Sequence, residues 1–255
     1  MPDLDNPDTT PLALEPDVLP PAPVARRRAT WPTWIEILLC SGYPTQIVVG
    51  QLLVLGGIRA QLPDGSLSGR FVFALSLVDS VLLVSLMVWL LVRRGERPSA
   101  IFFGGRPFGR EAATGALLLP VILALVIVLT VGIRQLLPAL HNVPDNPLEG
   151  LVGKGANIWL FLIVVIVAGG VREELQRAFL LHRFRGDLGQ PWMGLLITSI
   201  SFGMGHTLQG LDAAIITGVL GATWGALYLK RESAAASMIS HSLFNSVELL
   251  RVLTG

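Results

Sequence analysis

The sequence predicts an all-α fold, a polytopic transmembrane bundle of about seven membrane helices. Two observations predict it: hydrophobic residues make up 52% of the 255 residues and charged residues only 15%, and the mean hydropathy is +0.63. Soluble domains carry about 25% charged residues. This chain instead contains several apolar runs near the roughly 20 residues that a membrane-spanning helix needs.

Seven segments of the sequence have the composition of a membrane helix. Turn-forming residues separate them, notably at Pro63-Asp64-Gly65, in 104–107 and in the loop 138–155. The fourth segment is long and contains Gly169-Gly170, where we expect a kink or a close approach of two backbones. The expected helices cover residues 34–58, 71–92, 112–137, 156–184, 191–208, 210–229 and 233–253.

Residues 1–30 differ in composition from the rest of the chain. They contain seven of the 17 prolines and five acidic residues, without any apolar stretch. Such a composition is typical of disordered chain. We therefore expect a disordered cytoplasmic tail over residues 1–30 and a transmembrane helical domain over residues 31–255.

The basic residues are distributed unevenly along the chain. If the seven helices alternate in direction, 12 of the 19 lysines and arginines fall on one side of the membrane. An excess of Lys and Arg marks the cytoplasmic side, so the sequence predicts a multi-pass integral membrane protein with a cytoplasmic N-terminus. The 12 residues are Arg26, Arg27, Arg28, Arg93, Arg94, Arg97, Arg106, Arg110, Arg183, Arg185, Lys230 and Arg231.

Charge also limits the partners. The net charge is +1 and no basic stripe is present, so membrane lipid is an expected partner and nucleic acid is not. The sequence does not indicate an oligomeric state. Four polar residues in the first half, which we interpret as interfacial or interhelical hydrogen-bonding groups, are Glu36, Gln46, Gln51 and Asp79.

The chemistry-bearing residues lie in the C-terminal half, and the first group is the stretch 171–177. Ionised side chains at membrane depth are costly and usually face a cavity or a partner. Arg177 lies four residues after Glu173 and three after Glu174, so it can pair with either carboxylate on one helix face. One glutamate can then be held by the arginine while the other stays free. The alternative interpretation is an interfacial segment with solvated charges.

Two further motifs follow on later segments. Phe202 lies four residues before His206, and His241 lies four residues before Asn245, so each pair shares a helix face. Each motif alone is also compatible with interhelical hydrogen bonding. At about 1.5 Å per residue, however, Glu173, His206 and His241 fall in a similar middle layer of the membrane. Polar groups from three helices at one depth indicate a shared, water-filled site.

In this order, a Glu-Glu-to-Arg motif, Phe-x-x-x-His and His-x-x-x-Asn resemble the CPBP family of intramembrane proteases. This family includes CAAX-processing and bacteriocin-processing enzymes, among them the type II CAAX prenyl endopeptidases. The stretch Arg177-Ala178-Phe179-Leu180-Leu181 is also similar to the family sequence. The resemblance covers a catalytic core at about residues 155–250 and implies an intramembrane endopeptidase.

One spacing departs from the family pattern. The family has three residues between its glutamate pair and its arginine, whereas two residues separate Glu174 from Arg177 here. With the arginine as the anchor, Arg172 replaces the first family glutamate; with the glutamates as the anchor, Glu173 is catalytic. An arginine cannot serve as a general base, so we expect Glu173 to be catalytic, with Glu174 next. A local helix irregularity would absorb the difference.

The resemblance implies hydrolysis of a peptide bond in a membrane-associated peptide or protein, with a CAAX-type substrate as one option. Glu173 would activate water as a general base. Arg177 would orient the paired glutamate, and His206 would position the water or assist proton transfer. His241 and Asn245 would donate hydrogen bonds to the oxyanion.

Phe202 is the expected substrate-binding residue. Two histidines and a glutamate are also a familiar zinc ligand set, so a metalloprotease with zinc on Glu173, His206 and His241 stays an alternative, although no HExxH signature is present. Two other classes remain as hypotheses: a catalytically inactive membrane scaffold or immunity protein, and a proton-coupled transporter.

Overall fold

A computed structural model describes residues 31–144, 146–153 and 157–254. The tail 1–30, for which disorder is predicted, lies outside the described residues. The described chain is helical, without a β-strand; an isolated bridge pairs Gln61 with Leu67. The elements are α1 Trp31–Leu39, α2 Tyr43–Leu55, α3 Gly69–Arg93, α4 Pro98–Phe103, α5 Phe108–Leu136, η1 Pro138–Leu140, α6 Glu149–Gly153, α7 Ile158–Val164, η2 Val165–Arg172, α8 Glu173–Gly186, α9 Pro191–Met204, η3 Thr207–Gln209, α10 Leu211–Arg231 and α11 Ala235–Thr254.

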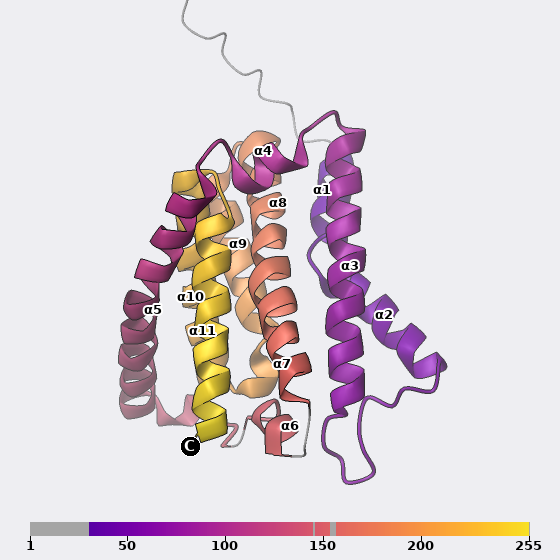
Figure 1. The fold of residues 1–255 in the computed structure, drawn as a ribbon, viewed down its shortest axis with the longest axis vertical. Coiled ribbons are helices and arrows are strands. Elements are labelled where there is room, and N and C mark those ends of the chain that lie inside the picture. Colours follow the sequence, from indigo (N-terminus) through magenta and orange to yellow (C-terminus); the bar gives the residue numbers. More distant parts are fainter. Residues whose placement is uncertain (1–30, 145, 154–156, 255) are drawn as a thin grey trace, which may run out of the picture.

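The helices pack side by side in one bundle (Figure 1). α9 lies against α10, and α11 packs against both α5 and η2. α2 and α3 form a pair on the other side of α8, and α3 also contacts η2. The segment η2–α8 therefore lies between the N-terminal helices and the C-terminal ones.

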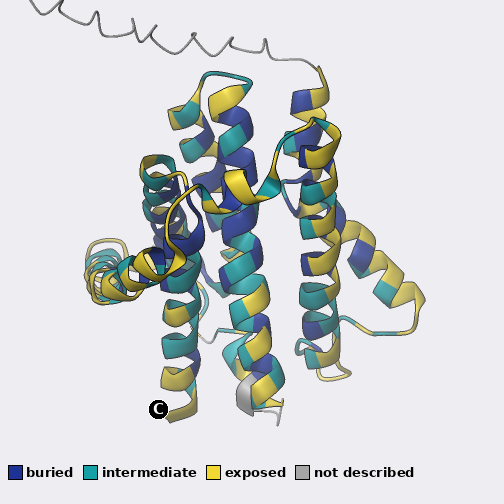
Figure 2. Cartoon of the chain, turned by 45° about the horizontal axis from the view of Figure 1, so that its top comes forward, coloured by how far each residue is buried: buried dark blue, intermediate teal, exposed yellow. Residues whose placement is uncertain are grey.

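Apolar side chains cover the outside of the bundle. Figure 2 shows buried residues gathered along the central helices and exposed residues on the outer ones. On α5, large side chains such as Leu117, Ile127 and Val128 are exposed. Soluble monomers rarely expose so continuous an apolar surface, whereas lipid tails accommodate it. The chain is an integral membrane protein.

Three described helices are long and apolar enough to cross a membrane: α3, α5 and α10. The bent pair α1–α2 raises the number to four if it counts as one span. Three expected segments remain. They are the consecutive helices α7–η2–α8, with charged residues in the middle, the 14-residue α9, and α11, which contains polar residues. Seven membrane spans therefore stay a prediction.

The expected helix 34–58 is broken, which corrects the prediction of a continuous segment. α1 ends at Leu39, α2 begins at Tyr43, and the two axes differ by 47°. Gly42 adopts φ +91°, a left-handed conformation that favours glycine, and Pro44 cannot continue the preceding helix. The break turns the start of α2 toward the middle of the bundle.

An ion-pair cluster ties α1 to the end of α8. Arg94, just after α3, contacts Glu36 at 2.8 Å and Asp187 at 2.6 Å. Arg183, which is fully buried, contacts Glu36 at 2.8 Å and Glu96 at 2.6 Å. Because α1 is fixed to α8 in this way, the break between α1 and α2 lies beside the polar centre of the bundle. Glu36 is thus an interhelical partner, one of the interpretations expected from the sequence.

Candidate active site

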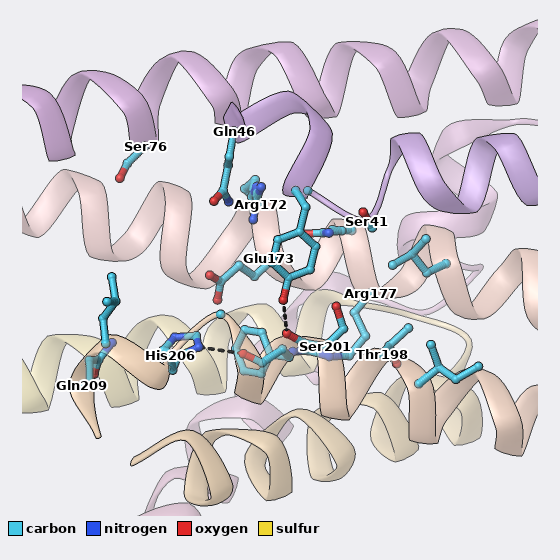
Figure 3. Close-up of a pocket in the computed structure, with 18 of the residues that line it drawn as sticks. Ser41, Gln46, Ser76, Arg172, Glu173, Arg177, Thr198, Ser201, His206 and Gln209 are labelled. Atoms are coloured by element: carbon cyan, nitrogen blue, oxygen red, sulfur yellow. Dashed lines mark hydrogen bonds between the residues drawn. The ribbon is translucent and has the colours of Figure 1, made fainter. Parts of the chain in front are cut away.

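A cavity of about 400 Å³ lies at the polar centre, enclosed by α2, α3, η2–α8 and α9 (Figure 3). The start of α8 contributes Glu173 and Arg177, and the turn after α9 contributes His206. α2 contributes Gln46 and α3 contributes Ser76. Its lining combines charged, amide, hydroxyl and apolar side chains, as ligand sites usually do.

Glu173 is the carboxylate that faces this cavity. It is the first residue of α8, and 20% of its side chain is exposed. Figure 3 shows its carboxylate directed toward the side of the cavity where His206 lies. Among the described residues, Glu173 has one ion-pair contact, with His241 Nε2 at 3.8 Å from its Oε2. Glu173 is therefore available to a molecule in the cavity.

Glu174 points the other way, into the helix packing. Its side chain is fully buried, and its Oε1 accepts hydrogen bonds from Arg177 Nη1 and from His241 Nδ1, the latter at 2.9 Å. Arg177 and His241 are also buried. The two adjacent glutamates thus differ in surroundings: Glu174 is bound by an arginine and a histidine, and Glu173 is open to the cavity.

The spacing of the first motif coincides with an irregular helix. Residues Val165–Arg172 form a π-helix that ends directly before Glu173. π-Helical turns are rare and occur frequently at functional sites. A Cβ on Gly170 would lie 2.0 Å from Ser242 Oγ, and one on Gly169 would lie 2.5 Å from Asn245 Nδ2. The glycine pair thus allows the close approach of α11 that was expected from the sequence.

His206 lies in a turn and not in a helix, which corrects the expected helix 191–208. α9 ends at Met204, and Gly205 and Gly210 flank the 3₁₀ turn that follows. The Nδ1 of His206 donates to the backbone carbonyl of Phe202 at 2.8 Å (Figure 3). This hydrogen bond assigns the proton to Nδ1, so Nε2 carries a lone pair.

Phe202 lines the cavity and also packs against the charged groups. Its ring lies 4.6 Å from the guanidinium carbon of Arg177 and 4.8 Å from the ring of His206. Its edge-to-face contact with His241 spans 6.0 Å at 88°. The aromatic ring therefore packs against both histidines and Arg177 at the edge of the cavity.

His241 and Asn245, predicted as oxyanion donors, form hydrogen bonds within the protein. Neither is among the described residues that line the cavity. Asn245 Nδ2 donates to the carbonyl of Val165 at 3.3 Å, at the beginning of the π-helix. On α11, His241 Nδ1 lies 2.9 Å from Glu174 and its Nε2 lies 3.8 Å from Glu173. The π-helix packs against α11, and the amide of Asn245 binds its backbone at Val165.

Two cavity residues that join helices, Tyr43 and Arg172, were not identified from the sequence as parts of the site. Tyr43 donates through its hydroxyl to the carbonyl of Ser201 at 2.7 Å, joining α2 to α9 (Figure 3). Arg172 lines the cavity and pairs with buried Asp79 of α3 at 2.5 Å. The turn signal of Gly42 and Pro44 could have indicated the position of Tyr43. Asp79 does make an interhelical contact, one of the roles expected for it.

The donor set does not fit a metal ion. Among the described residues, no group of three or more His, Cys, Asp or Glu side chains is arranged to hold one. The Nδ1 of His241 is engaged by Glu174, the Nδ1 of His206 is engaged by the carbonyl of Phe202, and the ring of Phe202 packs against both imidazoles. The zinc alternative on Glu173, His206 and His241 finds no support in this geometry.

Comparison with known proteins decides the family. Residues 155–247 match the family model described as "Type II CAAX prenyl endopeptidase Rce1-like". This segment belongs to the CPBP family of intramembrane proteases. No curated protein and no solved structure matches the chain. The Rce1-like segment runs from just before α7 into α11 and contains every motif residue named above, and membership of this family indicates a protease.

Proposed function

We propose that this protein is an intramembrane endopeptidase in which Glu173 activates the water that hydrolyses a peptide bond. The observation that carries the proposal is the different surroundings of two adjacent carboxylates. Glu174 is bound by Arg177 and His241 inside the packing, and Glu173 faces a cavity large enough for a peptide segment. A free carboxylate beside a substrate cavity is the arrangement that general-base catalysis needs.

Glu173 takes a proton from a water molecule as the water oxygen attacks the carbonyl carbon. The lone pair on Nε2 of His206 accepts a hydrogen bond from the same water and orients it. When the tetrahedral intermediate collapses, the carbon–nitrogen bond breaks and the proton on Glu173 passes to the leaving amine. The products are a carboxylic acid and an amine, and Glu173 is ionised again.

Positive charge for the oxyanion comes from the arginines that line the cavity. Arg172 and Arg177 are both among the residues that line the cavity, and fixed positive groups stabilise the developing negative charge in a site of low polarity. His241 and Asn245, expected as oxyanion donors, are bound to Glu174 and Val165. We therefore assign them to holding the catalytic helix in place.

The substrate is a membrane-associated peptide, and the family description favours the CAAX type. Several residues toward the far end of α8 and on α9 give one part of the cavity an apolar wall, among them Leu180, Phe184 and Ile197. This wall suits an apolar substrate segment beside the polar end that holds Glu173. Membrane lipid surrounds the bundle, with the seven helical segments as spans and the N-terminus in the cytoplasm.

A cleavage assay with purified protein tests the proposal. The substrate is a quenched fluorogenic peptide with a prenylated cysteine three residues before its C-terminus, presented in detergent micelles. We expect cleavage by the wild type and a loss of about 100-fold or more in Glu173→Gln and His206→Ala, since general bases contribute roughly 10²–10⁴. Glu248→Gln, an exposed glutamate near the end of α11, is the matched control and should retain activity.

Other outcomes identify other classes. Equal cleavage by wild type and Glu173→Gln would discard the proposed role of Glu173. No cleavage by any variant, with proton-coupled flux in liposomes that depends on Glu173, would identify a transporter. Neither cleavage nor flux is the result expected of an inactive scaffold or immunity protein.

A further inference from the structure

Trp224 of α10 stacks on His241, the histidine that binds Glu174 and lies close to Glu173. Its indole ring stacks on the imidazole of His241 with centroids 3.8 Å apart and planes inclined by 18°. Only 1% of Trp224 is exposed, and it is not among the described residues that line the cavity. The contact therefore acts on His241 and not on a molecule in the cavity.

The indole is itself fixed in place. Its Nε1 donates to Ser240 Oγ at 3.2 Å, and Ser240 is the residue before His241. On either side of Trp224, a Cβ on Gly221 would lie 2.8 Å from Phe202, and one on Gly225 would lie 2.5 Å from Leu195. α10 is thus packed tightly here, and the indole plane has a fixed orientation relative to α11.

The stack sets the direction in which the two ring nitrogens of His241 point. With the imidazole plane parallel to the indole, Nδ1 lies 2.9 Å from Glu174 and Nε2 lies 3.8 Å from Glu173. Rotation of the ring would move both nitrogens away from the carboxylates. An aromatic face also favours a nearby positive charge, and Trp224 offers this face to His241 and, at 6.0 Å, to Arg177.

We propose that Trp224 is a positioning residue for the hydrolysis, holding the imidazole plane of His241 so that its nitrogens face Glu174 and Glu173. This inference rests on the proposed function. Because Trp224 does not contact the cavity, its loss should lower kcat and leave KM unchanged. An aromatic replacement should preserve the stack, whereas an aliphatic one of similar size should not.

Three variants test this prediction with the prenylated fluorogenic peptide. Trp224→Phe should retain kcat within about threefold, and Trp224→Met should lower kcat by roughly tenfold or more with an unchanged KM. Tyr228→Met removes another buried aromatic side chain one turn further along α10; its hydroxyl contacts Ile101 and not the site. This control should leave kcat near that of the wild type. Equal losses in Trp224→Phe and Trp224→Met, or the same loss in Tyr228→Met, would overturn the proposal.

A second measurement does not depend on catalysis. We would compare thermal unfolding in detergent for Trp224→Met, His241→Gln and the double variant. Stacked partners should give a double-variant shift clearly smaller than the sum of the two single shifts. Additive shifts would overturn the positioning role even if the protein is an active protease. A coupled pair in a protein without cleavage activity would refute the proposed function and retain the stacking contact.

Discussion

Glu174 and His241 meet inside the bundle, with the Oε1 of Glu174 2.9 Å from the Nδ1 of His241. The same oxygen binds Arg177, so one carboxylate joins α8 to α11 and to the arginine of its own helix. All three side chains are buried. Glu174 is therefore the point at which the helix that carries Glu173 is fixed to the rest of the site.

Replacing Glu174 with glutamine should strongly destabilise the protein. The substitution leaves Arg177 as a buried charge without its counterion, and breaking such a pair costs about 3–5 kcal/mol. Denaturant unfolding in detergent, followed by circular dichroism, measures the change. The exposed pair Glu248–Arg251 is the control, since Glu248→Gln should change stability by less than about 1 kcal/mol. Similar effects of both substitutions would contradict the central role of Glu174.

The pair of Asp79 and Arg172 allows a different test, because both partners can be replaced. Asp79→Asn should destabilise the protein by several kcal/mol, as it leaves the guanidinium group unpaired in the packing. The double variant Asp79→Leu with Arg172→Met removes both charges and should unfold at a higher temperature than Asp79→Asn. Thermal unfolding in detergent makes the comparison. A double variant less stable than the single one would show that the ion pair has a net stabilising effect.

Gly170→Ala should destabilise the contact between the π-helix and α11. The added Cβ would lie 2.0 Å from Ser242 Oγ and 2.9 Å from Ser242 Cβ, and overpacking typically costs about 1–3 kcal/mol. Because Glu173 follows shortly after, peptide cleavage should fall as well. Gly132→Ala in α5 is the matched control: nothing lies within 4 Å of its added Cβ, and it should be neutral or slightly stabilising. A Gly170→Ala protein as stable as the control would mean that the two helices can separate without cost.

Glu96 should make stability depend on pH in the acidic range. Burial alone would raise its pKa, but hydrogen bonds from His182 and Arg183 outweigh this effect and lower the pKa from 4.5 to about 2. A carboxylate with a lowered folded pKa stabilises the fold above its unfolded pKa, and this contribution disappears as pH falls through the folded value. Stability should thus be lost between about pH 4.5 and pH 2.

The variant Glu96→Gln tests this dependence by thermal unfolding in detergent at pH 7 and near pH 2. At pH 7 it should unfold at a lower temperature than the wild type, because Arg183 and His182 lose their acidic partner. Near pH 2 the two proteins should unfold together. A difference that is the same at both pH values would show that the carboxylate charge does not stabilise the fold.

Local chain geometry made part of the site predictable. The pairing of Arg177 with one glutamate follows from a spacing of three residues on a helix, and the structure shows it with Glu174. The close approach at Gly169 and Gly170 was expected for a similar reason, since small side chains let helices pack tightly. The membrane class followed from composition, and the family from three short motifs in order.

Contacts between distant segments were not predictable from patterns. The partner of Arg172 is Asp79, 93 residues earlier, and nothing in the sequence around either residue indicates that α3 lies against the π-helix. A local helix irregularity was expected at the first motif, but the hydrogen bond from the amide of Asn245 to the carbonyl of Val165, where the π-helix begins, was not. Trp224 could not be identified from the sequence either. It carries no charge, and its contact with His241 depends on how α10 and α11 pack.

Two parts of the polypeptide, one before and one within the Rce1-like segment, contribute different side chains to one cavity. Its reactive groups come from η2, α8 and the turn after α9, within the Rce1-like segment, whereas Tyr43, Gln46 and Ser76 come from helices outside that segment. Under the proposed function, changes in α2 and α3 would therefore alter which peptides fit without changing the proposed hydrolytic residues. The fragment 155–247 alone would lack one side of the cavity, so grafting α2 and α3 from a related protease would test whether these helices determine the selectivity.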